Sequence, residues 1–167
     1  MNLQAEKPAD KDAEYNVTSC DPKNLSDADV GLCFAIIENG GAVDVQTMKR
    51  DFPKSTVLAI ACRGAQIVGV GAIKPVRERH ARKVALNSGV DFPSKTQELG
   101  YVAVDEHHRQ RGLSYRLVEK LLSNYAKRLF ATTDAEWMKK ALSKYGFSQK
   151  GKEWQGDRAM LSYWERL

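Results

Sequence analysis

The chain has 167 residues and a formal net charge of +5, with 43% hydrophobic and 28% charged residues. These proportions are ordinary for one globular domain that buries a core without disulfides or metals. No apolar run approaches the length of a membrane span, and residues 1–13 lack the apolar centre of a signal peptide. We therefore expect a cytoplasmic protein with no membrane partner. The three cysteines are widely spaced and form no C-x-x-C pair, so neither a disulfide framework nor a metal site is indicated.

Residues 1–13 mix charges with Pro8 and show no apolar period, which predicts a disordered leader followed by one domain over 14–167. Apolar patterns and turn residues predict the first half of that domain. The expected elements are a strand over 14–20, a helix from the Ser26 N-cap to Gly40-Gly41, a short helix over 45–52, and strands over 55–62 and 66–73 joined at Arg63-Gly64-Ala65.

Residues 76–96 form the least regular stretch of the sequence. Their charges include Arg77, Arg79, Arg82 and Lys83, and Asn87-Ser88-Gly89 is a turn signal. Such a run of charges favours a solvated loop. Because it directly precedes the predicted central strand, a basic lid over a binding site is the second interpretation.

The second half of the domain begins with an apolar run, Leu99 to Val104, that predicts a buried strand. Leu113, Leu117 and Leu121 then recur at helical spacing, in an amphipathic segment that ends near Leu129. The remaining expected elements are a strand over 128–132, a helix that starts at a Thr133–Glu136 capping box and stops at Gly146, and a hairpin over 147–153 and 159–164.

The turn before the helix at Leu113 is basic and contains Gly112. The first amides of a helix have no carbonyl partner inside it and lie at the positive end of its dipole, so they can bind a phosphate. A glycine lets the ligand approach the backbone closely. The overall positive charge also favours anionic ligands, which include both coenzyme A and nucleic acids.

Arg109-Gln110-Arg111-Gly112-Leu113-Ser114, preceded by Glu98-Leu99-Gly100-Tyr101-Val102-Ala103-Val104, resembles the acyl-coenzyme A motif of the GCN5-related N-acetyltransferase (GNAT) superfamily. That motif is written Q/R-x-x-G-x-G/A. Arg109 and Gly112 match it, whereas Ser114 replaces the last glycine or alanine. The resemblance runs from about residue 55 to the C-terminus. It implies a single α/β domain of the GNAT fold, with a twisted mixed, largely antiparallel sheet of about six or seven strands and about four helices.

The resemblance also implies a chemistry, which is transfer of an acetyl group from acetyl-coenzyme A to a primary amine of a small molecule or protein. It places the pantetheine arm on the backbone of Val102, Ala103 and Val104, and the pyrophosphate on the amides of Arg109 to Ser114. It makes Glu98 the general base for the amine, in direct transfer. The alternative for Glu98 is a salt bridge at the end of a strand. Arg77, Arg79, Arg82 and Lys83 are the candidate acceptor-binding residues.

The proton donor for the departing thiolate is where the family pattern fails. Leu142 stands where many members carry a tyrosine, and Ala135 replaces an asparagine of the same helix. Two other functions are therefore open. One is toxin-like acetylation of charged tRNA, which the size and basic charge suggest, although the basic segment lacks the interleaved aromatics that stack on bases. The other is non-catalytic binding of acyl-coenzyme A, which the missing tyrosine suggests. The acceptor, the physiological acyl group and the oligomeric state, a homodimer included, are not fixed by the sequence.

Overall fold

The computed structural model describes residues 14–41, 43–123 and 125–167, so the predicted leader over 1–13 lies outside the described residues. The helices are α1 (Asp27–Asn39), α2 (Val45–Asp51), α3 (Glu78–Ser88), α4 (Leu113–Ser123) and α5 (Glu136–Lys144). The strands are β1 (Tyr15–Cys20), β2 (Val57–Arg63), β3 (Gln66–Lys74), β4 (Gln97–Val104), β5 (Leu129–Thr133), β6 (Ser148–Gln155) and β7 (Met160–Arg166). Short 3-10 turns lie at η1 (Pro22–Asn24), η2 (Phe52–Lys54) and η3 (Glu106–His108).

The described strands form one sheet in the order β1-β2-β3-β4-β5-β7-β6. The β4–β5 pair is parallel, and the other neighbouring pairs are antiparallel. This arrangement confirms the predicted mixed, largely antiparallel sheet. None of the described helices is long and apolar enough to cross a membrane.

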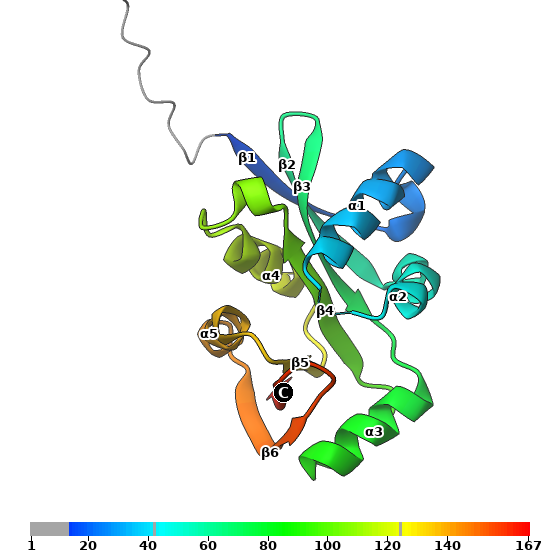
Figure 1. Ribbon diagram of the computed structural model, residues 1–167, viewed down its shortest axis with the longest axis vertical. Coiled ribbons are helices and arrows are strands. Elements are labelled where there is room, and N and C mark those ends of the chain that lie inside the picture. The colour runs from blue at the N-terminus through cyan, green and yellow to red at the C-terminus, as the bar shows by residue number, and fades with distance from the viewer. Residues whose placement is uncertain (1–13, 42, 124) are drawn as a thin grey trace, which may run out of the picture.

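Helices cover both faces of the sheet (Figure 1). On one face α1 and α2 pack on β2 and β3 through a core that includes Met48, Phe52 and Leu58. On the other face α4 and α5 pack through a larger core that includes Leu117 and Leu142. α3 lies apart from both pairs, against β6 and β7. The central strand β4 therefore has a helical layer on each side.

The predicted loop over 76–96 is wrong in its first part, where the chain forms α3. Ala81 and Val84 are buried and Ala85 is partly buried, which is one apolar stripe at helical spacing. Gly89 ends the helix with φ of 73°, and its N–H donates to the carbonyl of Ala85 at 2.9 Å. The turn signal was therefore a helix C-cap, and the small apolar stripe was obscured by the charges around it.

Two helix boundaries also differ from the prediction. α4 ends at Ser123 rather than near Leu129, which instead begins β5. The predicted capping box at Thr133 is absent, because Ala135 is the N-cap of α5 and the Thr133 hydroxyl accepts from the Ala135 N–H at 3.0 Å. By contrast, Ser26 caps α1 as predicted and accepts from the Asp29 N–H at 3.1 Å.

Candidate active site

The two parallel strands in the middle of the sheet, β4 and β5, separate soon after they begin. Their ladder consists of two residue pairs, Gln97 with Leu129 and Glu98 with Phe130. Beyond Glu98, residues 100–103 of β4 are only half-buried, although the strand is central in the sheet order. A strand without a neighbour presents backbone N–H and C=O groups with which an extended ligand can pair. The resemblance assigns the pantetheine arm to the backbone of Val102, Ala103 and Val104, which belong to this strand.

A β-bulge changes the direction of β4 beside this opening. The β3–β4 register shifts between Val70 and Ala72, so that Tyr101 and Val102 both lie opposite Gly71. Tyr101 has φ of 55°, which is uncommon for a residue other than glycine. Bulges and such backbone conformations are frequent beside functional sites, where they redirect a side chain.

The turn between β4 and α4 has the geometry expected of an anion site. Gln110 and Gly112 have φ of 61° and 72°. The Arg116 N–H donates to the Gly112 carbonyl at 3.2 Å, so the amides of Leu113 and Ser114 precede the hydrogen-bond ladder of α4. A Cβ atom at Gly112 would meet no heavy atom within 4 Å. The helix N-terminus is therefore next to open space, as phosphate binding requires.

Contacts within the protein hold this turn in place. Arg109 Nε donates to the carbonyl of Val104 at 3.0 Å. His108 is buried, and its Nδ1 lies 2.8 Å from the hydroxyl of Tyr15. The guanidinium of Arg111 lies 5.8 Å from the Tyr15 ring centroid. The conformation of the turn is thus fixed without a ligand.

At the opposite end of β4, side chains from two other elements lie beside the carboxylate of Glu98. Lys74 of β3 is the ladder partner of Glu98, and its Nζ lies 3.3 Å from Oε2. His80 of α3 places Nε2 3.4 Å from the same oxygen. Lys74 Nζ also lies 4.2 Å from the ring centroid of Tyr101. The Glu98 side chain is 8% exposed and that of His80 is 44% exposed, so a ligand can reach the histidine far more readily.

The Glu98–Lys74 pair is ionised at neutral pH. Burial alone would raise the pKa of Glu98, but Lys74 and His80 lower it to about 2. Burial alone would lower the pKa of Lys74, but Glu98 and Tyr101 raise it above its ordinary value. A carboxylate with so low a pKa is a weak proton acceptor. Yet within the described residues Oε2 is buried without a well-directed hydrogen bond, although two nitrogens lie within 3.4 Å.

The predicted acceptor-binding residues all lie on α3 or directly before it, but two of the four have acidic partners. Arg77 pairs with Asp51 at 3.0 Å. Arg82 pairs with Glu78 one turn away on α3. The other two, Arg79 and Lys83, are exposed. The four cations therefore do not act as one array of equal charges.

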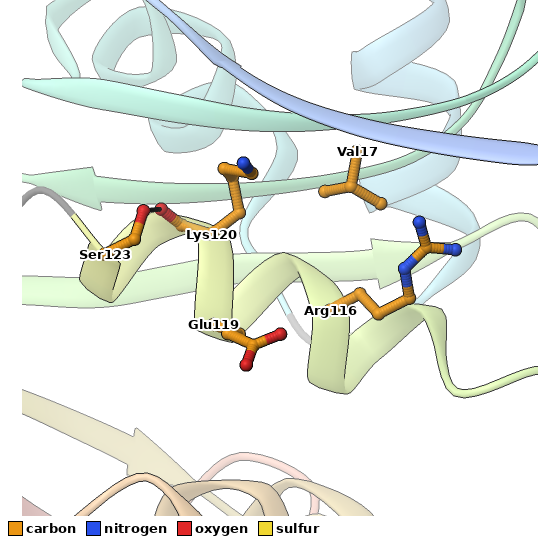
Figure 2. A pocket seen from close by; sticks show the side chains of 5 residues that line it. All are labelled: Val17, Arg116, Glu119, Lys120 and Ser123. Atoms are coloured by element: carbon orange, nitrogen blue, oxygen red, sulfur yellow. Dashed lines mark hydrogen bonds between the residues drawn. The ribbon is translucent and has the colours of Figure 1, made fainter.

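Two hollows lie outside the opening between β4 and β5. One of about 150 Å³ is lined by Asp51, Lys54, Pro75, Val76 and Arg77, directly after Lys74 in the chain. The other, of about 410 Å³, lies between β1 and α4 and is lined by Val17, Arg116, Glu119, Lys120 and Ser123 (Figure 2). The guanidinium of Arg116 donates a hydrogen bond to the carbonyl of Tyr15 at 3.0 Å, and the Ser123 hydroxyl donates to the Lys120 carbonyl at 2.7 Å. The residues that line the hollow in Figure 2 come from β1 and α4 and include none of β4.

The side chain at the position of the family's tyrosine cannot donate a proton. Leu142 is fully buried in the core under α5. The neighbouring Tyr145 is partly buried on the same core, with Lys144 Nζ 5.4 Å from its ring centroid.

Sequence reasoning selected Glu98 but missed its partners Lys74, His80 and Tyr101. Lys74 was missed because the strand predicted over 66–73 stops before it and the next was expected to begin at Leu99, so no register paired Lys74 with Glu98. His80 could not be placed, since its position depends on α3, which was expected to be a loop. Tyr101 was missed because it lies at the β-bulge, which no residue pattern in the sequence indicates.

Comparison with known proteins agrees with this geometry. The profile of the acetyltransferase (GNAT) family matches residues 27–147. No curated protein matches the chain significantly in sequence.

Solved structures with the same fold cover nearly the whole chain. Escherichia coli ElaA superposes with a TM-score of 0.66 and 12% identity, over 92% of this chain and 99% of that chain. An acyl-CoA N-acyltransferase from Pseudomonas aeruginosa gives 0.66 and 16%, over 92% and 99%. The ribosomal-protein-S18-alanine N-acetyltransferase of Escherichia coli gives 0.62 and 12%, over 91% and 92%. At these identities the likeness shows the fold alone. The family profile spans most of the chain and includes the β4 opening and the turn after it, so the protein belongs to the acetyltransferase (GNAT) family of acyltransferases, which use acyl-coenzyme A.

Proposed function

We propose that this protein transfers an acetyl group from acetyl-coenzyme A to a primary amine of a small molecule or a protein. The observation that carries the proposal is the early end of the β4–β5 ladder at Glu98 and Phe130. It leaves one side of β4 free beyond Glu98, and this free side leads into the turn with positive φ at Gly112. An extended thioester arm and a pyrophosphate need these two features in this order.

The residues assigned to the donor fit this role. Val102, Ala103 and Val104 contribute backbone groups along the opening, and the amides from Arg109 to Ser114 lie at the N-terminus of α4. Bound there, acetyl-coenzyme A supplies an activated carbonyl carbon and a thiolate leaving group. The protein then has to hold the thioester near Glu98 and deliver the amine in its neutral form.

We assign Glu98 to the step that removes a proton from the acceptor amine. A lysine-like amine has a pKa near 10.4, so it is almost entirely charged at neutral pH and needs a base. Glu98 forms the last pair of the β4–β5 ladder, where the opening begins. Lys74 and His80 lower the pKa of the Glu98 carboxyl to about 2, so the carboxylate accepts a proton poorly by itself. Glu98 therefore assists the proton transfer by acting on a neighbouring group.

The proposal is tested by calorimetry and by turnover. Acetyl-coenzyme A should bind the full chain with one-to-one stoichiometry, and desulfo-coenzyme A should compete for the site. Spermidine, an alanine-initiated tripeptide and Nα-acetyl-lysine amide then serve as acceptors, with the acetylated amine detected by mass spectrometry. Binding of the donor without acetylation of any primary amine would remove the proposed amine transfer.

A non-catalytic acyl-coenzyme A binding module is the second candidate. The observation that favours it is Leu142, which is buried where the family's tyrosine would protonate the thiolate. The same two measurements distinguish it, since a binding module retains the calorimetric signal but forms no acetylated product. Water can protonate a thiolate, so the lack of a tyrosine slows turnover without abolishing it.

A further inference from the structure

We propose that His80 takes the proton from the acceptor amine, and that Glu98 and Lys74 position His80 for this step. The inference rests on the proposed amine transfer and names the group that handles the proton within that site. In this scheme the exposed imidazole of His80 contacts the substrate, and the buried carboxylate of Glu98 acts through it.

The geometry gives His80 access that Glu98 lacks. The His80 side chain is 44% exposed, whereas that of Glu98 is 8% exposed. His80 lies in the first turn of α3, three residues after Arg77, which lines the hollow of about 150 Å³. Of the two groups, His80 is therefore the one that an incoming amine can reach.

The carboxylate orients the imidazole. His80 Nε2 lies 3.4 Å from Oε2 of Glu98, and that oxygen is buried without a well-directed hydrogen bond in the described structure. A proton on Nε2 satisfies this oxygen and leaves the lone pair of Nδ1 free to accept a proton. Bonds of this kind are often long in the absence of substrate and shorten in the reacting complex.

Lys74 determines which role Glu98 plays. Its Nζ lies 3.3 Å from Oε2, and its side chain is 17% exposed. The buried ammonium keeps Glu98 ionised, so the carboxylate accepts hydrogen bonds but competes poorly for protons. The remaining negative charge on Glu98 then stabilises the imidazolium that forms on His80. The ring of Tyr101, 4.2 Å from Nζ, holds the ammonium from its other side.

The elements around α3 carry other charged groups. On α3 itself Glu78, Arg79, Arg82 and Lys83 are exposed, and the charged groups of the facing strands are Lys74, Glu98, Lys150, Lys152, Glu153, Glu165 and Arg166. Among the described groups, Glu98 is the acid within ion-pair distance of His80.

The acceptor ammonium gives one proton to Nδ1 of His80 and becomes a neutral amine. Its nitrogen forms a C–N bond to the thioester carbonyl carbon, and the C–S bond breaks with its electron pair on sulfur. The nitrogen loses a second proton, which neutralises the thiolate directly or through water. His80 then returns its own proton to solvent, for which its exposure is suited.

The kinetic test compares variants with the best amine among spermidine, the alanine-initiated tripeptide and Nα-acetyl-lysine amide. His80→Gln should lower kcat by roughly a hundredfold or more, with acetyl-coenzyme A affinity within about twofold of the parent. Free imidazole should restore part of the activity of His80→Ala. Leu86→Gln, at an exposed position on the same helix, is the matched control and should leave both constants unchanged. Parental kcat in His80→Gln would overturn the proposal.

Non-additivity tests the positioning role of Glu98. If Glu98 acts through His80, adding Glu98→Gln to His80→Gln should change kcat by less than about threefold, although Glu98→Gln alone is costly. The acid limb of the pH–rate profile should disappear in His80→Gln. Independent losses that multiply in the double variant would make Glu98 the base and overturn the proposal.

A measurement without acceptor keeps the inference separate from the proposed function. The chain has three histidines, so the ring nitrogens are resolved by ¹⁵N NMR and His80 is assigned from its absence in His80→Gln. At pH 8 the neutral ring should carry its proton on Nε2 and leave Nδ1 bare. A proton on Nδ1 would overturn the inference even if acetyl transfer is found. Failure of acetyl-coenzyme A to bind the parent would instead overturn the proposed function.

Discussion

The two ends of β4 are built in different ways. At its C-terminal end, the turn to α4 offers backbone amides, fixed by positive φ at Gln110 and Gly112 and by the Arg109–Val104 hydrogen bond. At its N-terminal end, Glu98 is surrounded by side chains that come from other elements, Lys74 and His80. The first end is a property of one continuous segment. The second exists only after three elements have packed together.

This difference explains what each end can do. A pyrophosphate is the same in every acyl-coenzyme A, so a fixed set of amides serves any donor of that class. Acceptor amines differ in the groups that surround the nitrogen. Side chains that come from separate elements can be substituted without changing the turn at the C-terminal end of β4. Substitutions at the C-terminal end of β4 should therefore change acetyl-coenzyme A affinity, whereas substitutions at the N-terminal end should change turnover.

The largest effect should come from Gly112→Glu. The added side chain enters the open space beside the α4 N-terminus and brings a negative charge to the proposed phosphate site. We expect acetyl-coenzyme A affinity, measured by calorimetry, to fall by more than about a hundredfold, equivalent to about 3 kcal/mol.

Gly64→Glu is the matched control for this substitution. Gly64 also has positive φ, 59°, with nothing within 4 Å of a Cβ atom, but it lies in the β2–β3 turn. Both variants bear the same kind of backbone strain, so only a loss confined to Gly112→Glu identifies the phosphate site. Equal affinities in the two variants would contradict the assignment.

The same contrast separates what the sequence could predict from what it could not. The strand, turn and helix around Gly112 were predictable, because apolar period, glycine and basic residues all occur within one stretch. The cluster at Glu98 was not, since His80 reaches it from α3, whose stripe of Ala81 and Val84 contributes little apolar area among many charges. Local patterns predict local sites, whereas a site assembled from distant elements needs the packing first.

The charge pair at the N-terminal end of β4 should also govern acid stability. Glu98 has a pKa of about 2 in the folded protein against an ordinary value of 4.5. A pKa that is lowered by folding contributes stability that is complete above the unfolded value and is lost as pH falls through the folded value. At pH 7 Glu98→Gln should lose about 2–4 kcal/mol of unfolding free energy, because it also leaves Lys74 buried and unpaired. Urea unfolding at several pH values measures this, and the difference from the parent should narrow between about pH 4.5 and pH 2.

Replacing both partners is the control for this loss. Lys74→Met combined with Glu98→Leu removes both charges and keeps apolar volume, so most of the stability at pH 7 should return. A parent and a Glu98→Gln variant with parallel stability curves down to pH 2 would show that the pair does not couple folding to pH.

A smaller effect should follow when α3 is displaced from the sheet. A Cβ atom at Gly151 would collide with the carbonyl oxygen of Ser88 and would lie 2.6 Å from Val90 Cγ2. Gly151→Ala therefore pushes the C-terminal end of α3 away from β6 and should cost about 1–3 kcal/mol in thermal or urea unfolding. Because α3 carries His80, turnover should fall while acetyl-coenzyme A affinity is unchanged.

Gly146→Ala provides the comparison, since Gly146 also has positive φ, 87°, but no atom lies within 4 Å of its Cβ position. It shares the backbone strain and lacks the collision with α3. If both variants lose the same stability and turnover, the docking of α3 has no specific role in positioning His80.

The smallest effect is expected from the basic residues of α3, and it decides between a small or protein amine and charged tRNA. If tRNA is the acceptor, replacing Arg77, Arg79, Arg82 and Lys83 by serine should weaken its binding and flatten the salt dependence, because each phosphate contact releases counterions. We expect little change, since Arg77 and Arg82 are already paired with Asp51 and Glu78 and no aromatic side chains alternate with the cations to stack on bases. The measurement is tRNA binding at two salt concentrations for the parent, this variant and a control that replaces four exposed lysines elsewhere, Lys23, Lys127, Lys140 and Lys152. A steep parental slope that is lost in the α3 variant and kept in the control would reverse this expectation and make charged tRNA the acceptor.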